Sequence, residues 1–259
     1  MSELTDRVTA GDPRAIARAI SLVENGTDEG AAFLRDISGR AKRAYVIGVT
    51  GPPGAGKSTL VDRLAGALRS PERSRGAAAP TVGILAVDPS SPFSGGAVLG
   101  DRLRMQSHSA DEGVFIRSMA TRGHLGGLAR ATADAARVLD AAGKDFVIIE
   151  TVGVGQAEID IVRTADVSIV VLVPGAGDEV QALKAGIMEI ASIFVVNKAD
   201  REGADRVVSA IESYLSLESK GARPQIVKTV ATTGEGIPEL IAAIEAFRKA
   251  TLKGSPHSS

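Results

Sequence analysis

The sequence predicts an α/β protein with a mostly parallel sheet, helices on both faces and a small helical cap at its N-terminus. Short apolar stretches alternate with helical patterns along most of the chain, which is the order of strand–helix–strand units. These stretches are apolar from end to end, as is typical of strands buried on both faces. A glycine-rich loop follows the first of them and leads into a helix.

Residues 1–43 are predicted to form a helical N-terminal extension packed on the main domain. Asp12 and Pro13 supply a helix start, since aspartate caps the first N–H groups and proline suits the first turn. Apolar residues at helical spacing follow up to Val23, and a second amphipathic stretch ends at Ile37.

Residues 44–250 are predicted to form the main domain, and residues 251–259 a disordered polar tail. Helices are expected at 128–142, before a C-capping Gly143, and at 237–250. Ligands of parallel sheets bind at the carboxyl ends of the strands. The expected strands are Tyr45–Thr50, Thr81–Val87, Val114–Arg117, Asp145–Ile149, Val167–Val173, Ile193–Val196 and Gln225–Val230.

The first strand runs into a segment that fits GxxxxGK[ST], the pattern of a P-loop NTPase. Its glycines allow successive backbone N–H groups to face one anion, and the following helix adds the positive end of its dipole. Lys57 is expected to reach the β- and γ-phosphates, and the Ser58 hydroxyl to bind Mg²⁺. The predicted phosphate-binding residues are Gly51, Gly54, Ala55, Gly56, Lys57, Ser58 and Thr59.

The strand that ends at Ile149 continues into Glu150, Thr151, Val152 and Gly153, which has the form of a Walker B segment. An acidic group at this place can hold Mg²⁺ through water, and the Gly153 amide can approach a γ-phosphate. The alternative is an ordinary acidic residue at the end of a strand.

Residues 197–200 read NKAD after another strand and fit NKxD, which selects guanine. Asp200 can accept hydrogen bonds from guanine N1 and N2, whereas adenine offers no such donor pair. Asn197 is expected to brace the loop, and the Lys198 stem to lie along the base. Ala231 occupies the place of a second guanine-contacting loop, although the usual serine and lysine are missing there.

Four segments together resemble the MeaB type of P-loop GTPase, also known by the older label ArgK: Asp88–Met105, Glu150–Glu158, Pro174–Ala191 and Asn197–Asp200. The resemblance extends over residues 12–244. It implies a GTPase that binds GTP or GDP with Mg²⁺, hydrolyses GTP slowly and acts as a chaperone. The implied partner is an adenosylcobalamin-dependent acyl-CoA mutase of the methylmalonyl-CoA mutase type, whose cofactor loading or protection it would control.

The resemblance also implies roles for individual residues. Asp88 and Asp101 match acidic residues of the first switch, although Asp88 before a proline could equally form a simple turn. Residues 153–156 match the second switch, and residues 175–184 match a segment that responds to nucleotide when the mutase binds. The implied catalytic residues are Lys57, Asp88 and Gly153, and the implied Mg²⁺ ligands are Ser58, Asp88, Asp101 and Glu150.

Composition excludes several other classes. The 30 basic and 31 acidic residues give no electrostatic argument for a nucleic-acid partner, and a 3% aromatic content argues against base stacking. The chain lacks cysteine, and His108 and His124 have no second ligand at metal spacing, so neither a disulfide scaffold nor a zinc site is expected. The sequence shows no signal peptide and no membrane-length apolar run, which favours a cytoplasmic protein with no membrane partner.

Two other functions remain open on the sequence alone. A P-loop can serve a kinase that acts on a small molecule, which would need an acceptor pocket and a catalytic base. A GTPase for metallocentre insertion is the third reading, weakened by the lack of cysteine and of a histidine cluster. Members of the resembled family dimerise through a long C-terminal arm, which we expect to be missing here. A monomer, a dimer through the switch face and a dimer formed on the partner therefore all stay open.

Overall fold

The computed structural model describes residues 2–40, 43–70, 78–88, 108, 110–120, 125–151, 159–160, 162–175, 188–217 and 223–254. Its helices are α1 (Ser2–Thr9), α2 (Pro13–Glu24), α3 (Asp28–Ile37), α4 (Lys57–Leu68), α7 (Leu125–Ala141), α10 (Ala204–Leu217), α11 (Ile237–Gly254) and the short 3₁₀ helix η2 (Met188–Ile190). Its strands are β1 (Tyr45–Thr50), β2 (Val82–Asp88), β3 (Val114–Ala120), β4 (Phe146–Thr151), β5 (Val167–Leu172), β6 (Ile193–Asn197) and β7 (Gln225–Thr229).

The strands form one seven-stranded sheet in the order β3-β2-β4-β1-β5-β6-β7. All six neighbouring pairs are parallel. The predicted parallel α/β fold is therefore confirmed. Because the strands run the same way, their carboxyl ends share one edge, where β1 leads into the glycine loop, β4 ends in Glu150 and Thr151, and β6 ends in Asn197.

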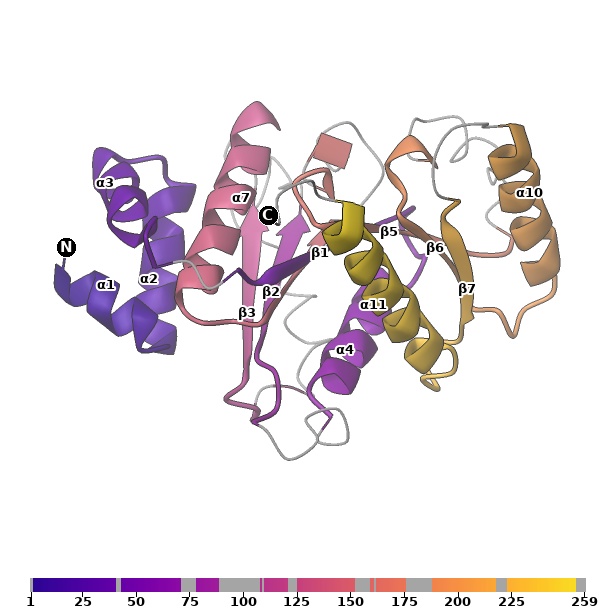
Figure 1. The fold of residues 1–259 in the computed structure, drawn as a ribbon, viewed down its shortest axis with the longest axis horizontal. Coiled ribbons are helices and arrows are strands. Elements are labelled where there is room, and N and C mark those ends of the chain that lie inside the picture. The colour runs from indigo at the N-terminus through magenta and orange to yellow at the C-terminus, as the bar shows by residue number, and fades with distance from the viewer. Residues whose placement is uncertain are drawn as a thin grey trace.

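Helices cover both faces of the sheet (Figure 1). Helices α4 and α11 lie on one face, against side chains such as Ile47, Ile148 and Ile169. Helix α7 covers β2 and β4 on the other face, with α1, α2 and α3 packed around it and α2 in contact with β3. Helix α10 covers β5 and β6 on that second face, through residues such as Val170 and Phe194. Because alternate residues of one strand enter different cores, the strands are apolar throughout.

The N-terminal helices begin where the sequence predicts caps. The Asp12 side chain accepts from the N–H groups of Arg14 and Ala15, with Pro13 in the first turn of α2. The sequence reading did not separate α1 from α2, although Gly11 adopts a φ of +81° between them. Arg117 of β3 donates to the Ser21 hydroxyl of α2 at 2.9 Å. The N-terminal extension is therefore also hydrogen-bonded to β3, the first strand of the sheet.

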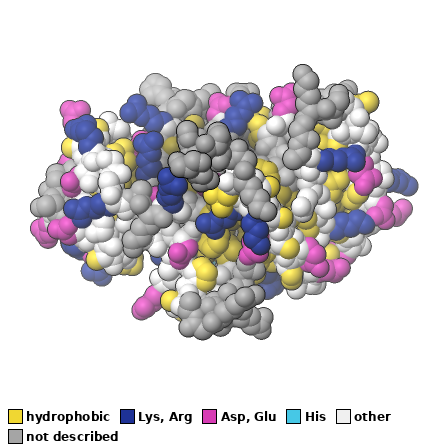
Figure 2. Space-filling view, viewed as in Figure 1, with side chains coloured by type: hydrophobic (Ala, Val, Ile, Leu, Met, Phe, Trp, Pro, Cys, Tyr) yellow, Lys and Arg dark blue, Asp and Glu magenta, His cyan; other side chains and the backbone are white. Residues whose placement is uncertain are grey.

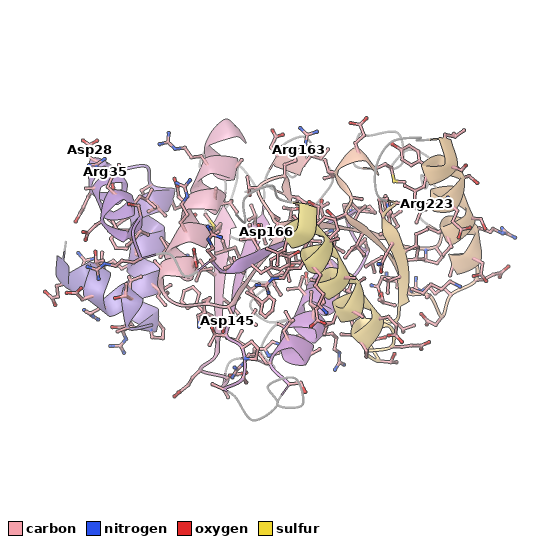
Figure 3. The ribbon with its side chains drawn as sticks, viewed as in Figure 1. Asp28, Arg35, Asp145, Arg163, Asp166 and Arg223 are labelled. Atoms are coloured by element: carbon pink, nitrogen blue, oxygen red, sulfur yellow. The ribbon has the colours of Figure 1, made fainter. Side chains whose placement is uncertain are left out.

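Aspartates secure the amino-terminal edge of the sheet. Asp145 and Asp166, labelled in Figure 3, immediately precede β4 and β5. Asp145 Oδ2 accepts from the Thr81 N–H at 2.7 Å, and Asp166 Oδ2 accepts from the Val46 N–H at 2.7 Å. These carboxylates satisfy strand N–H groups that lie beyond the last ladder bond. These carboxylates therefore connect neighbouring strands at their amino-terminal ends, whereas the motifs lie at the carboxyl-terminal ends.

The final helix α11 continues to Gly254, four residues beyond its predicted end. None of the helices in the described part of the chain is long and apolar enough to cross a lipid bilayer. Figure 2 shows basic and acidic side chains spread across the face seen in Figure 1, with neither sign gathered into one large patch.

Candidate nucleotide-binding site

The backbone of the glycine loop between β1 and α4 adopts φ angles that residues with a side chain rarely adopt. Gly51, Gly54 and Gly56 have φ angles of +150°, +76° and +83°. A Cβ on Gly51 would lie 2.2 Å from the Val171 carbonyl oxygen, and one on Gly56 would lie 2.6 Å from Asn197 Nδ2. The loop is therefore pressed against β5 on one side and against the NKAD motif on the other.

Helix α4 begins at Lys57 with its N-terminus directed to this loop. Its N-cap, Gly56, supplies no side-chain hydrogen bond to the first turn. The first N–H groups and the positive end of the helix dipole together favour an anion. Lys57 is 5% exposed, and its ammonium donates to the carbonyls of Gly51 at 2.7 Å and Pro52 at 3.0 Å. The charge needed for a phosphate is thus already held inside the loop.

Two oxygen-bearing side chains meet beside Lys57. The Ser58 hydroxyl donates to Glu150 Oε1 at 2.6 Å, and Glu150 is only 2% exposed. A hydroxyl and a buried carboxylate are hard oxygen donors, so they fit Mg²⁺. Asp88 ends β2 at the same edge, next to β4, although its side chain is not among those described. Asp101 and Gly153 lie outside the described residues.

Asn197 joins the base-binding motif to the phosphate loop. Its side chain is buried at 2% exposure, and Nδ2 donates to the Ala55 carbonyl at 2.8 Å. Its Oδ1 accepts from the Thr229 hydroxyl and from the Ala231 N–H, both at 3.1 Å. One amide therefore connects its own segment to the phosphate loop and to residues 229–231, which are distant in sequence. This gives a physical basis for the predicted bracing role of Asn197.

Lys198 and Asp200 follow at the carboxyl end of β6. Lys198 has a φ of +56°, and its ammonium donates to the Gly54 carbonyl at 2.7 Å. Its stem therefore passes along the outside of the phosphate loop. Asp200 lies in the next turn and is exposed. This placement leaves its carboxylate accessible to a ligand.

The segment 230–234, which is predicted to be a second guanine-contacting loop and is called the base loop below, forms a turn after β7. Ala231 is 3% exposed, and the N–H groups of Thr233 and Gly234 close a turn onto the Val230 carbonyl at 3.0 and 2.9 Å. Arg63 of α4 donates to the carbonyls of Ala231 at 3.2 Å and Thr232 at 2.8 Å. The sequence analysis missed Arg63, because no motif or spacing ties this helix position to a loop 168 residues later.

Comparison with known proteins agrees with this geometry. A model of the family described as "Methylmalonyl Co-A mutase-associated GTPase MeaB" matches residues 16–257. The chain belongs to the MeaB family of GTPases. Its function as a GTPase and its binding of guanine nucleotide follow from this membership, and the resemblance stated from the sequence is confirmed.

MeaB relatives occur in several organisms. A Pyrococcus abyssi protein that carries a GTPase name is 55% identical over 96% of this chain and 76% of its own length. The GTPase ArgK of Escherichia coli is 35% identical over 96% and 76%. The mouse protein "Methylmalonic aciduria type A homolog, mitochondrial" is 38% identical over 79% of this chain and 49% of its own length.

Solved structures extend the likeness to the fold. The crystal structure of a "LAO/AO transport system kinase" has a TM-score of 0.75 and 30% identity, and covers 98% of this chain and 76% of the other. Helicobacter pylori HypB in complex with nickel has a TM-score of 0.53 at 19% identity, covering 88% and 97%, and shares the fold alone.

Several segments to which the resemblance to the MeaB family gives a role lie outside the described residues. They are the second switch at 153–156 and most of the nucleotide-responsive segment at 175–184. His124, for which no metal role is expected, also lies outside the described residues. His108 is described, and its Nε2 lies 2.9 Å from the Asp62 carbonyl oxygen on α4. Among the described residues, no three His, Cys, Asp or Glu side chains are grouped to hold a metal ion.

Proposed function

We propose that this MeaB-family protein is a guanine-nucleotide switch that serves as a chaperone of an adenosylcobalamin-dependent acyl-CoA mutase. It would hydrolyse GTP slowly and control how the mutase loads or protects its cofactor. The family description names a methylmalonyl-CoA mutase-associated GTPase, which supports this partner class. The proposed place of action is the cytoplasm.

One observation supports a guanine-nucleotide site most strongly. The NKAD motif is hydrogen-bonded directly to the phosphate loop, through Asn197 to Ala55 and Lys198 to Gly54. The base and phosphate subsites are therefore built as one unit at the carboxyl edge of the sheet. We place the base against Asp200, Lys198 and Ala231, and the phosphates against residues 51–59.

We propose that Mg²⁺ binds beside the phosphates. Ser58 would ligate it directly, Glu150 through water, and Asp88 and Asp101 would complete the acidic surroundings. Bound Mg²⁺ neutralises charge that develops on the phosphate oxygens. Lys57 would leave the carbonyls of Gly51 and Pro52 to contact the β- and γ-phosphates.

The same site would drive a conformational switch. In this scheme the γ-phosphate orders the segments 88–101 and 153–156, with the Gly153 amide contacting it, and hydrolysis releases them. Phosphoryl transfer depends mostly on positioning and on charge stabilisation. We therefore expect slow hydrolysis by the isolated protein and faster hydrolysis when a partner holds these segments in place.

Binding to a purified methylmalonyl-CoA mutase tests the proposal. We expect complex formation that differs at least about fivefold in affinity between GDP and a non-hydrolysable GTP analogue, because a switch must bind its partner differently in two states. The mutase should also accelerate GTP hydrolysis. Equal affinity in both states together with unchanged hydrolysis would contradict the chaperone function, and light scattering of the same samples would report the oligomeric state.

A further inference from the structure

Arg63 is a second side chain that holds the base loop, in addition to Asn197. Its Nε donates to the Ala231 carbonyl at 3.2 Å, and its Nη2 donates to the Thr232 carbonyl at 2.8 Å. Asn197 Oδ1 meanwhile accepts from the Ala231 N–H at 3.1 Å. The loop is thus held between a buried amide and a guanidinium, which bonds two successive carbonyls with two of its donors.

These contacts fix the direction of the loop N–H groups. The described residues contain no cis peptide, so the C=O and N–H of each peptide point in opposite directions. With the Ala231 carbonyl held by Arg63, the Thr232 N–H points away from the Arg63 guanidinium. The next peptide is held on both sides, by Arg63 at the Thr232 carbonyl and by the Val230 carbonyl at the Thr233 N–H.

Arg63 also connects this loop to the phosphate subsite. It lies on α4, six residues after Lys57, which corresponds to about 9 Å along the helix. The helix that carries Lys57 and Ser58 at its start therefore carries the loop contact in its middle. A displacement of the base loop relative to the phosphates would have to break these two hydrogen bonds.

We propose that Arg63 is a positioning residue for guanine recognition, which holds the Ala231–Thr232 peptide so that the Thr232 N–H faces the O6 atom of the base. This role rests on the proposed placement of guanine between Asp200 and the 230–234 loop. Asp200 reads N1 and N2, and the loop held by Arg63 reads O6. The two groups therefore contribute to specificity at different atoms.

Removal of the guanidinium should leave the fold intact. Arg63 is exposed, and it borders a cavity of about 400 Å³ between α4 and α11 that is also lined by Ala67 and Ile241. A shorter side chain at this position leaves no void inside a packed core. Its effect should therefore appear in nucleotide binding more than in unfolding.

The test measures dissociation constants of the full chain with Mg²⁺ for GDP, IDP and 6-thio-GDP. The variants are Arg63→Gln, Arg63→Lys and Asp200→Asn. The matched control Arg137→Gln removes an exposed charge from α7, on the opposite face of the sheet. IDP lacks the amino group at N2, whereas 6-thio-GDP replaces O6 by sulfur, which is a weaker acceptor.

We expect Arg63→Gln to weaken GDP about tenfold, because both hydrogen bonds to the loop are lost. The preference for GDP over 6-thio-GDP should shrink while the preference over IDP is kept, and Arg63→Lys should recover part of the loss. Unchanged constants, or an equal loss for all three nucleotides, would overturn the inference. If Asp200→Asn also left the IDP preference unchanged, the base placement itself would be wrong, whereas a normal Asp200 response would confine the failure to Arg63.

Discussion

The phosphate loop takes its shape mainly from three glycines, whereas the base loop, in which Gly234 alone has a positive φ, is held mainly by side chains that reach it from other elements. In the phosphate loop, three glycines with positive φ direct the chain around an anion site. In the base loop, the amide of Asn197 and the guanidinium of Arg63 hold the main chain. Lys198 spans the two, since it follows β6 and donates to Gly54.

Because of this difference, the phosphate loop and the base loop should tolerate different substitutions. A backbone cradle fails when any side chain is added where only hydrogen fits. A loop held by side chains fails when a donor or acceptor is lost, because the buried partner is left unsatisfied. Substitutions of each kind therefore separate the two halves.

Gly51→Ala should have the largest effect. The new Cβ would meet the Val171 carbonyl oxygen at 2.2 Å, at a φ of +150° that other residues avoid. We expect a loss of about 3 kcal/mol or more in unfolding free energy and no measurable nucleotide binding. Gly54→Ala is the matched control, because nothing lies within 4 Å of its Cβ. It should cost only about 1 kcal/mol in urea unfolding, and equal losses for both variants would show that contact with β5 is unimportant.

Asn197→Ala should be the most damaging change to the base loop. It removes the partner of the Ala55 carbonyl, the Thr229 hydroxyl and the Ala231 N–H from a buried position. We expect about 2–4 kcal/mol of lost stability, measured by urea unfolding, and a GDP affinity at least tenfold lower. Thr229→Val removes one of these bonds and should cost about 1 kcal/mol. A stable Asn197→Ala protein with normal GDP affinity would show that this amide is not needed to hold the phosphate loop and the base loop together.

Asp111 precedes β3 at the amino-terminal ends of the strands, remote from both loops. A change there should alter stability without altering nucleotide binding. Arg69 donates to its two oxygens at 2.6 and 2.9 Å, and these hydrogen bonds lower the pKa of the Asp111 carboxyl. Because the folded pKa is below the unfolded value of about 4, the stabilisation is complete above that pH. It is lost as the pH falls through the folded pKa.

Urea unfolding between pH 7 and pH 3 checks this expectation. Asp111→Asn should lower stability by about 1 kcal/mol at pH 7 and should flatten the fall below pH 4. GDP affinity at pH 7 should stay within twofold of the unaltered protein, since Asp111 precedes β3 at the amino-terminal edge of the sheet. A pH dependence as steep as that of the unaltered protein would exclude Asp111 as its source.

Lys198→Met should have the smallest effect. The change keeps an apolar stem beside the base but removes the ammonium that donates to the Gly54 carbonyl at an exposed position. We expect GDP affinity to fall about threefold, as befits one solvent-accessible hydrogen bond. Lys249→Met on α11 controls for the loss of charge. A hundredfold loss would mean that Lys198 contributes to the phosphate cradle itself.

The same comparison explains what could be predicted from the sequence. The glycine loop and the strand that precedes it lie within about 15 consecutive residues, so their pattern reveals both the local geometry and the anion site. The alternation of apolar strands and helices likewise predicted the parallel sheet. The contacts of Asn197, Arg63 and Arg69 join positions far apart in sequence, and only the folded chain shows which ones meet. The first helix was not separated from the second, because it spans only eight residues, too few for a helical period to stand out from the sequence.

We infer that the carboxyl ends of the strands bind guanine nucleotide and that Asp200 recognises the base. Affinities for GDP, xanthosine diphosphate and ADP with Mg²⁺, measured for the unaltered protein and for Asp200→Asn, test it most directly. We predict that the unaltered protein prefers GDP over ADP by at least about 100-fold. Asp200→Asn should lose that preference and favour xanthosine diphosphate, because an asparagine can donate to the oxygen at C2. Equal binding of ADP and GDP that does not respond to Asp200→Asn would contradict the account.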